Sequence, residues 1–151
     1  MFFKLRDGDD FGWRAACIWG LASGAGFGIA EGILYSSEHY NGIATFGIYL
    51  VRFISCVGLH AIWTGAVSLM IWHNQEMLGA DMDWGDWLLA VLRVQGVPMV
   101  LHGLYDTLLK REMNAAALLP AVASFAWLAF LISRSYAADP APEDDALPAV
   151  A

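Results

Sequence analysis

The amino-acid sequence predicts an all-α fold, a polytopic membrane bundle of about four transmembrane helices. Of the 151 residues, 58% are hydrophobic and only 15% are charged, whereas average proteins have about 45–50% and about 25%. A soluble domain of this size leaves about a third of its surface in water and needs charge there. The composition therefore argues against an ordinary water-soluble domain and against a disordered chain.

Four apolar stretches are long enough to cross a bilayer as helices, for which about 20 residues are needed. They run over about 15–35, 43–72, 87–109 and 116–133. The second stretch is long enough to tilt or to project from the membrane. The polar connectors between the stretches are predicted to be loops, at 36–42, 73–86 and 110–114. Tryptophans near the ends of the stretches, Trp13, Trp72, Trp84 and Trp87, suit the membrane interface.

We expect residues 1–136 to form a single transmembrane domain. Residues 137–151 are acidic and rich in proline and alanine, so they cannot bury a core and are expected to form a disordered tail. The basic residues favour both termini inside. Four of them lie on the side of the termini, Lys4, Arg6, Arg14 and Arg134, against Lys110 and Arg111 in the third loop.

Charge and cysteine content exclude further classes of protein. The net charge is −7, so there is no basic patch to neutralise phosphates, and a nucleic-acid partner is excluded. The two cysteines, Cys17 and Cys56, are too few for a disulfide framework. We expect both to be small buried hydrophobic residues.

Four glycines recur at a spacing of four residues in the first stretch, at Gly20, Gly24, Gly28 and Gly32. They lie on one helix face, where the missing side chains let another backbone approach closely. Helix packing of this kind would draw the helix that carries Glu31 deep into a bundle. The same ridge could bind a second copy of the chain or a subunit of a larger membrane complex.

Several polar side chains lie within the apolar stretches, where a charged group costs at least about 2.5–3.5 kcal/mol. They are Glu31 in the first, Arg52 and His60 in the second, and Arg93, His102 and Asp106 in the third. His102 and Asp106 are four residues apart and share a helix face. Two imidazoles with carboxylates form a plausible ligand set for zinc, with a position left open for water.

Spacing alone leaves other interpretations of these polar residues open. Arg52 or Arg93 could pair with Glu31 or Asp106 and lock the bundle, while His102 bonds Asp106 one turn away. A mid-span histidine could also ligate a pigment or haem. Transport is a further alternative, although the four stretches do not resemble one another in pairs as inverted repeats do.

Three segments resemble successive motifs of the PrsW family of intramembrane metalloproteases, which is related to the CAAX-protease and bacteriocin-processing group. Residues 24–35 hold Phe27-x-x-x-Glu31, residues 52–68 hold an arginine followed eight residues later by His60, and residues 97–109 hold His102-x-x-x-Asp106. The resemblance extends from about residue 20 to residue 109. It lies on three successive predicted spans.

The resemblance implies a helical membrane fold and metal-dependent cleavage of membrane-anchored substrates within the bilayer of the bacterial inner membrane. Glu31 matches the second family motif, His60 the third, and His102 and Asp106 the fourth. His60 and His102 are therefore the expected metal ligands, with zinc as the metal considered, and Glu31 and Asp106 the expected catalytic carboxylates. No residues for any other cofactor are implied.

The sequence departs from the family pattern at two points. Cys56 occupies the aromatic position of the third motif, and the first motif, Glu-Glu-x-x-Lys, has no counterpart because the chain contains no Glu-Glu pair. Glu31 would then serve as the base, or a partner chain would supply a carboxylate. Alternatively, the protein is a non-catalytic accessory subunit of a larger membrane complex, which the short length favours.

Overall fold

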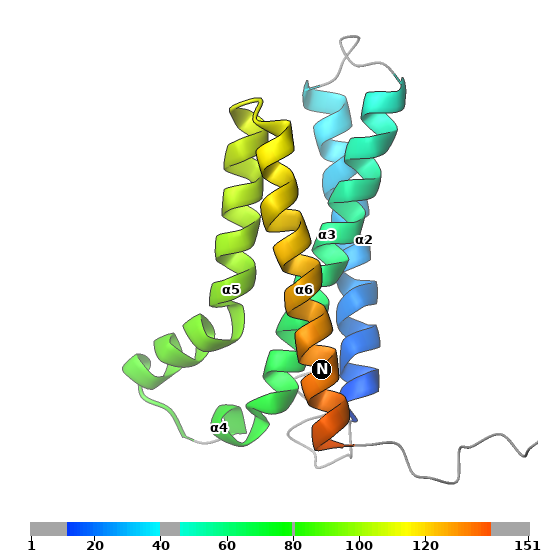
Figure 1. The fold of residues 1–151 in the computed structure, drawn as a ribbon. Helices are drawn as coiled ribbons and strands as arrows, with labels where there is room; N and C mark the ends of the chain where they lie inside the picture. Colours follow the sequence, from blue (N-terminus) through cyan, green and yellow to red (C-terminus); the bar gives the residue numbers. More distant parts are fainter. Residues whose placement is uncertain (1–11, 40–45, 80, 140–151) are drawn as a thin grey trace, which may run out of the picture.

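The computed structural model describes residues 12–39, 46–79 and 81–139, with the backbone alone for 35–39, 46–52 and 79. The described residues form five helices and no strand: α2 (Trp13–His39), α3 (Phe46–His73), α4 (Gln75–Gly79), α5 (Trp84–Lys110) and α6 (Asn114–Ala138) (Figure 1). Four of the helices contain a segment long and apolar enough to cross a membrane, Trp13–Leu34, Phe53–His73, Trp84–Lys110 and Asn114–Ala138. The predicted all-α bundle with four spans is confirmed.

Three of the helices, α2, α5 and α6, are longer than the apolar stretches that predict them, whereas α3 begins at Phe46, three residues after the start of its stretch. The helix α2 continues to His39, inside the predicted connector 36–42, and α6 continues to Ala138, past the predicted end at 133. Only the part of a helix that lipid or protein covers needs apolar side chains. The backbone hydrogen bonds of the helix can continue into polar turns beyond that part, so the helix extends past the apolar stretch. At the start of α5, the Asp83 side chain accepts a hydrogen bond of 2.9 Å from the Asp86 backbone N–H, so the helix begins at Trp84. Residues 140–151 of the expected tail lie outside the described part of the chain.

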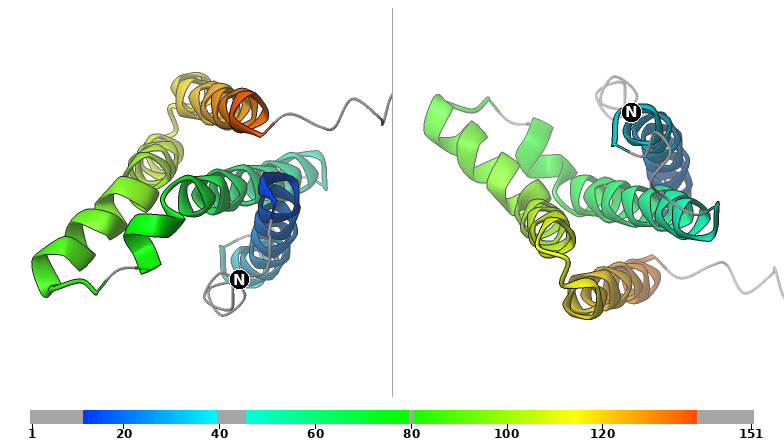
Figure 2. Two further views of the ribbon diagram at one scale, coloured as in Figure 1. Left: turned by 90° about the horizontal axis from the view of Figure 1, so that it is seen from below. Right: turned by 90° about the horizontal axis from the view of Figure 1, so that it is seen from above.

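The helix α3 lies in the middle of the bundle and packs against each of the other four helices. Seen along the bundle, α2 lies against one side of α3, and α5 and α6 lie on the others (Figure 2). The start of α2 and the end of α6 meet, because the Trp13 indole Nε1 donates a hydrogen bond of 3.2 Å to the Asp139 carbonyl. Trp13 is consequently buried. Protein therefore covers Trp13 at this end of the bundle, whereas Trp84 is highly exposed.

The four-residue glycine ridge packs α2 against α3 of the same chain. A Cβ atom at Gly24 would overlap the His60 carbonyl oxygen, and one at Gly28 would lie 2.7 Å from the Val57 Cα. All four glycines of the ridge are buried. The ridge is therefore not available to a second copy or another subunit in this conformation, which corrects that part of the prediction and confirms the close helix packing.

The helix α5 bends, and its first part leans away from the bundle before the second part runs beside α6 (Figure 1). Pro98 lies inside this helix and is buried. Proline has no N–H for the carbonyl four residues earlier, and its ring crowds that carbonyl, so it bends the helix. His102 follows one turn after Pro98, on the part of α5 that lies beside α3.

Candidate metal centre

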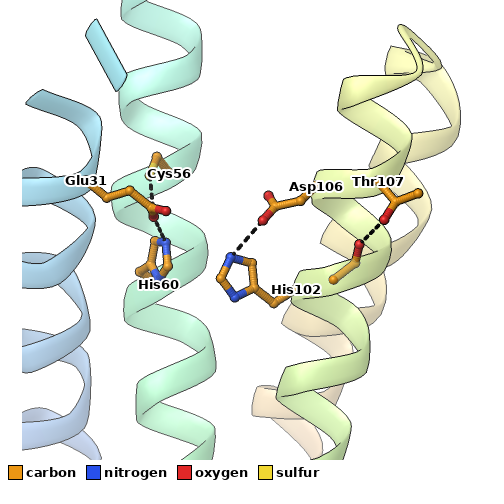
Figure 3. Close-up of polar contacts among 7 residues, drawn as sticks. Glu31, Cys56, His60, His102, Asp106 and Thr107 are labelled. Carbon is orange, nitrogen blue, oxygen red and sulfur yellow. Dashed lines mark hydrogen bonds and ion pairs between the residues drawn. The ribbon is translucent and has the colours of Figure 1, made fainter. Parts of the chain in front are cut away.

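The carboxylate of Glu31 meets the His60 imidazole between α2 and α3. Glu31 Oε2 contacts His60 Nε2 directly, and the Cys56 thiol lies 3.5 Å from the same oxygen (Figure 3). The side chains of Glu31 and His60 are 21% and 9% exposed. The contact depends on the glycine ridge, because a larger residue at Gly24 or Gly28 would hold the two backbones apart.

The second pair of polar side chains comes from α5 and faces the first. His102 Nε2 lies 3.2 Å from Asp106 Oδ2, one turn further along the helix. The ring centroids of His60 and His102 are 5.0 Å apart, with the rings nearly perpendicular at 83°. Figure 3 shows the two imidazoles turned toward each other from α3 and α5.

Glu31, His60 and His102 each offer one ligand atom, and these atoms all lie within 4.8 Å of one another. Asp106 is not a member of this group of three, and it contacts the group through His102. The structure therefore brings three of the four predicted site residues together directly. It places the fourth beside His102, one turn further along α5 (Figure 3).

Arginine does not neutralise this cluster in the described part of the chain. The ion pairs that the described side chains form here join Glu31 to His60 and Asp106 to His102. Arg93 is nine residues before His102, and it lies with Trp72 and His73 around an open pocket at the other end of the bundle. The alternative in which Arg93 locks Glu31 or Asp106 is therefore wrong. The Arg52 side chain lies outside the described residues.

Aromatic rings surround the two histidines. The Phe27 ring, one turn before Glu31, meets His60 edge to face at 4.9 Å. The Trp63 indole stacks on His102 at 4.4 Å and 28°, and the edge-to-face distance from Trp63 to His60 is 5.4 Å. Aromatic contacts of this geometry restrict the orientation of the imidazole rings.

The donor atoms of the cluster fit a divalent metal ion. Two imidazole nitrogens and one carboxylate oxygen form a ligand set found in catalytic zinc sites, with a fourth position open. In a tetrahedral site with bonds near 2.0–2.1 Å the donor atoms lie about 3.3–3.5 Å apart. Donor atoms within 4.8 Å of one another can reach that spacing through small side-chain rotations. A cation would also neutralise a carboxylate that is costly at this depth.

Sequence reasoning missed two side chains of the site. Cys56 was expected to be a buried hydrophobic residue, but its thiol points at Glu31. Its position four residues before His60, on the same helix face, is the signal that could have found it. Trp63 follows His60 by three residues and also shares that face, although nothing in its spacing specifies a contact with His102.

The fold and the cluster together define an integral membrane protein with a candidate set of metal ligands, Glu31, His60 and His102, between its transmembrane helices. The family model of the PrsW family intramembrane metalloproteases matches residues 12–133, and the chain belongs to this family. The matched region contains the whole cluster and nearly all of the four described spans. Neither a curated protein nor a solved structure matches the chain.

Proposed function

We propose that this protein is a metal-dependent protease of the bacterial inner membrane that cleaves a membrane-anchored substrate within the bilayer. The observation that supports this most is the group of Glu31, His60 and His102, whose ligand atoms lie within 4.8 Å of one another. Each residue comes from a different membrane-spanning helix. Polar groups that converge in this way at membrane depth are a functional arrangement by default.

Glu31, His60 and His102 would hold the metal, with zinc as the ion that suits this donor set. When bound, the ion would supply Lewis-acid activation of water and of the substrate carbonyl. Glu31 thus acts as a third ligand in this proposal, in addition to the two histidines expected from the motifs.

Asp106 has two tasks in this proposal. Through Oδ2 it holds the His102 ring, as carboxylates commonly do for metal-bound histidines. Its other oxygen can accept a proton from the attacking water and pass it to the leaving amine. The Asp106 side chain is 44% exposed, so a substrate that enters beside α5 can reach it.

The proposal is tested by measuring metal content and cleavage on the same purified protein. Wild-type protein in liposomes should bind about one zinc ion per chain and cleave a single-span substrate. A chelator should abolish cleavage, and added zinc should restore it. His60→Ala and Glu31→Gln should lose both metal and cleavage, because each removes a ligand.

Asp106→Asn separates the two roles of Asp106. We expect Asp106→Asn to weaken zinc binding about tenfold, in the range seen when a group that hydrogen-bonds a metal ligand is changed. We expect it to reduce cleavage at saturating zinc at least about 100-fold, since a general base contributes about 10²–10⁴-fold. Glu31→Gln that retained zinc but not cleavage would make Glu31 the base instead. Wild-type protein that bound no metal and cleaved none of a broad substrate panel would overturn the proposal and favour an accessory subunit.

A further inference from the structure

The Trp63 indole connects the candidate metal centre to α6, a helix that contributes none of the candidate ligands. One face of the indole stacks on His102, and the ring also meets His60 edge to face. At the edge of the ring, Trp63 Nε1 donates a hydrogen bond of 2.8 Å to Ser124 Oγ of α6. Trp63 therefore contacts both histidines, and the hydrogen bond from its ring nitrogen to Ser124 fixes the indole to α6.

The direction of the hydrogen bonds behind Trp63 is unambiguous. The indole N–H can only donate, and a serine hydroxyl has one hydrogen. The Ser124 hydroxyl donates that hydrogen to the Pro120 carbonyl at 2.7 Å, so it accepts from Trp63. Trp63 is 6% exposed and Ser124 is 1% exposed. Water cannot replace either bond, and loss of the hydroxyl would leave the indole N–H without an acceptor.

The position of His102 relative to His60 depends on few other contacts. The helix α5 packs on α3 much less extensively than α2 does, and α5 is bent at Pro98. Near His102, the described polar link between the two helices is a hydrogen bond of 3.3 Å from Tyr105 to Ser55. The Trp63 indole stacks directly on the His102 ring, which also contacts Asp106 of its own helix and the His60 ring.

We propose that Trp63 is a positioning residue that holds His102 opposite His60, and that Ser124 of α6 fixes Trp63 in that place. The expected effect of Trp63 and Ser124 on zinc affinity rests on the proposed function. Their expected effect on the positions of His102 and His60 does not, because those positions can be measured without metal. The helix α6 thereby becomes part of the support of the site.

The chain contains a matched control for Ser124. Ser135 lies on the same helix and is fully buried. Its hydroxyl donates to the carbonyl four residues earlier, on Leu131, at 2.8 Å, and it lies 3.0 Å from His73 Nε2 of α3. Ser135→Ala thus removes an equivalent α3–α6 bridge, eleven residues away and next to a different histidine.

The first measurement is the NMR spectrum of the histidine rings in detergent, which is tractable because the chain has four histidines. Ser124→Ala should shift the His102 and His60 resonances and leave His73 in place. Ser135→Ala should shift His73 alone. Trp63→Phe should also shift His102 and His60. Adding Ser124→Ala to Trp63→Phe should then have no further effect on them, because phenylalanine has no N–H to hold.

The second measurement is zinc affinity and cleavage. We expect Ser124→Ala to weaken zinc binding roughly tenfold, the lower end of the range for changes to groups that support metal ligands. Ser135→Ala should change zinc affinity less than about twofold. Unmoved His102 resonances in Ser124→Ala, or equal effects of the two serine variants on zinc affinity, would overturn the proposal. If wild-type protein binds no zinc, the proposed function fails, while the histidine spectra still decide the positioning role.

Discussion

Glu31 makes contacts that neither its motif nor its charge specifies. It touches His60 of the next helix, and the Cys56 thiol lies against the same carboxylate oxygen. The thiol can donate its hydrogen to Glu31, which fixes one oxygen of the carboxylate. The family motif has an aromatic residue at this position. In this chain Phe27, one turn before Glu31, supplies a ring that packs on His60.

At the residue scale we predict that Cys56 orients Glu31. Cys56→Val removes the donor and adds one methyl group, and it should weaken zinc binding about two- to fivefold, since a hydrogen bond from the weak S–H donor contributes about 1 kcal/mol or less. Cys56→Ser keeps a donor and should bind zinc as tightly as wild type. Competition with a chromophoric chelator measures the affinities.

The matched control for Cys56 is Cys17→Val. Cys17 is buried in the hydrophobic core near the start of α2, fourteen residues before Glu31, and its replacement should leave zinc affinity unchanged. If all three cysteine variants bound zinc equally well, the thiol would be only a packing group.

At the scale of elements, the α2–α3 pair determines whether Glu31 can reach His60. The two backbones approach so closely at Gly24 that an added Cβ would overlap the His60 carbonyl oxygen. A helix with small residues on one face gains van der Waals contact with its neighbour, which is the main attraction between helices in lipid. The same contact places a carboxylate from one helix against an imidazole from the other.

Gly24→Ala should therefore separate α2 from α3. We expect a loss of about 1–3 kcal/mol in the free energy of unfolding, as for overpacked cores, together with weaker zinc binding. Gly26→Ala is the control, since a methyl group added at Gly26 would meet nothing within 4 Å, and alanine favours a helix by about 0.5–1 kcal/mol. Denaturation in a detergent series, followed by circular dichroism, measures the stability of both variants. Equal unfolding midpoints for the two would contradict the role of the close approach.

On the scale of the whole molecule, four crossings place both ends of the bundle on one side of the membrane. The hydrogen bond from Trp13 to the Asp139 carbonyl closes that end. The Arg14 guanidinium also lies over the Trp13 ring, 4.6 Å from its centroid. The connector between α3 and α5 lies at this same end, and the turn between α5 and α6 lies at the other (Figure 1).

The distribution of basic residues predicts that the end with both termini faces the cytoplasm. Single cysteines can test this in intact cells, in a background with Cys17 and Cys56 replaced. Met113→Cys, in the turn between α5 and α6, should react with a membrane-impermeant maleimide from outside. Asp81→Cys, in the connector before α5, should react only after permeabilisation. The reverse pattern would contradict the predicted orientation. Labelling of both cysteines from outside would show that α5 does not cross the membrane, which contradicts the model of four crossings.

The sequence identifies the candidate ligands but does not show which of their side chains contact one another in the folded protein. A spacing of four residues places His102 and Asp106 on one face of a helix, and the structure confirms their contact. The rotation of one helix against another is not encoded in such spacing. For that reason Arg93 was an open partner for Glu31 on sequence grounds, whereas in the structure it lies at the opposite end of the bundle.

A helical membrane fold of four spans follows from the sequence alone, because the length of an apolar stretch sets whether it can cross lipid. The family also follows from the sequence, because three motifs fall in order on three spans. That Glu31, His60 and His102 form one cluster, with Asp106 beside His102, is seen in the folded structure alone. Depth and rotation depend on contacts between helices, here the glycine ridge against α3, the bend at Pro98 and the Trp63 indole held by Ser124.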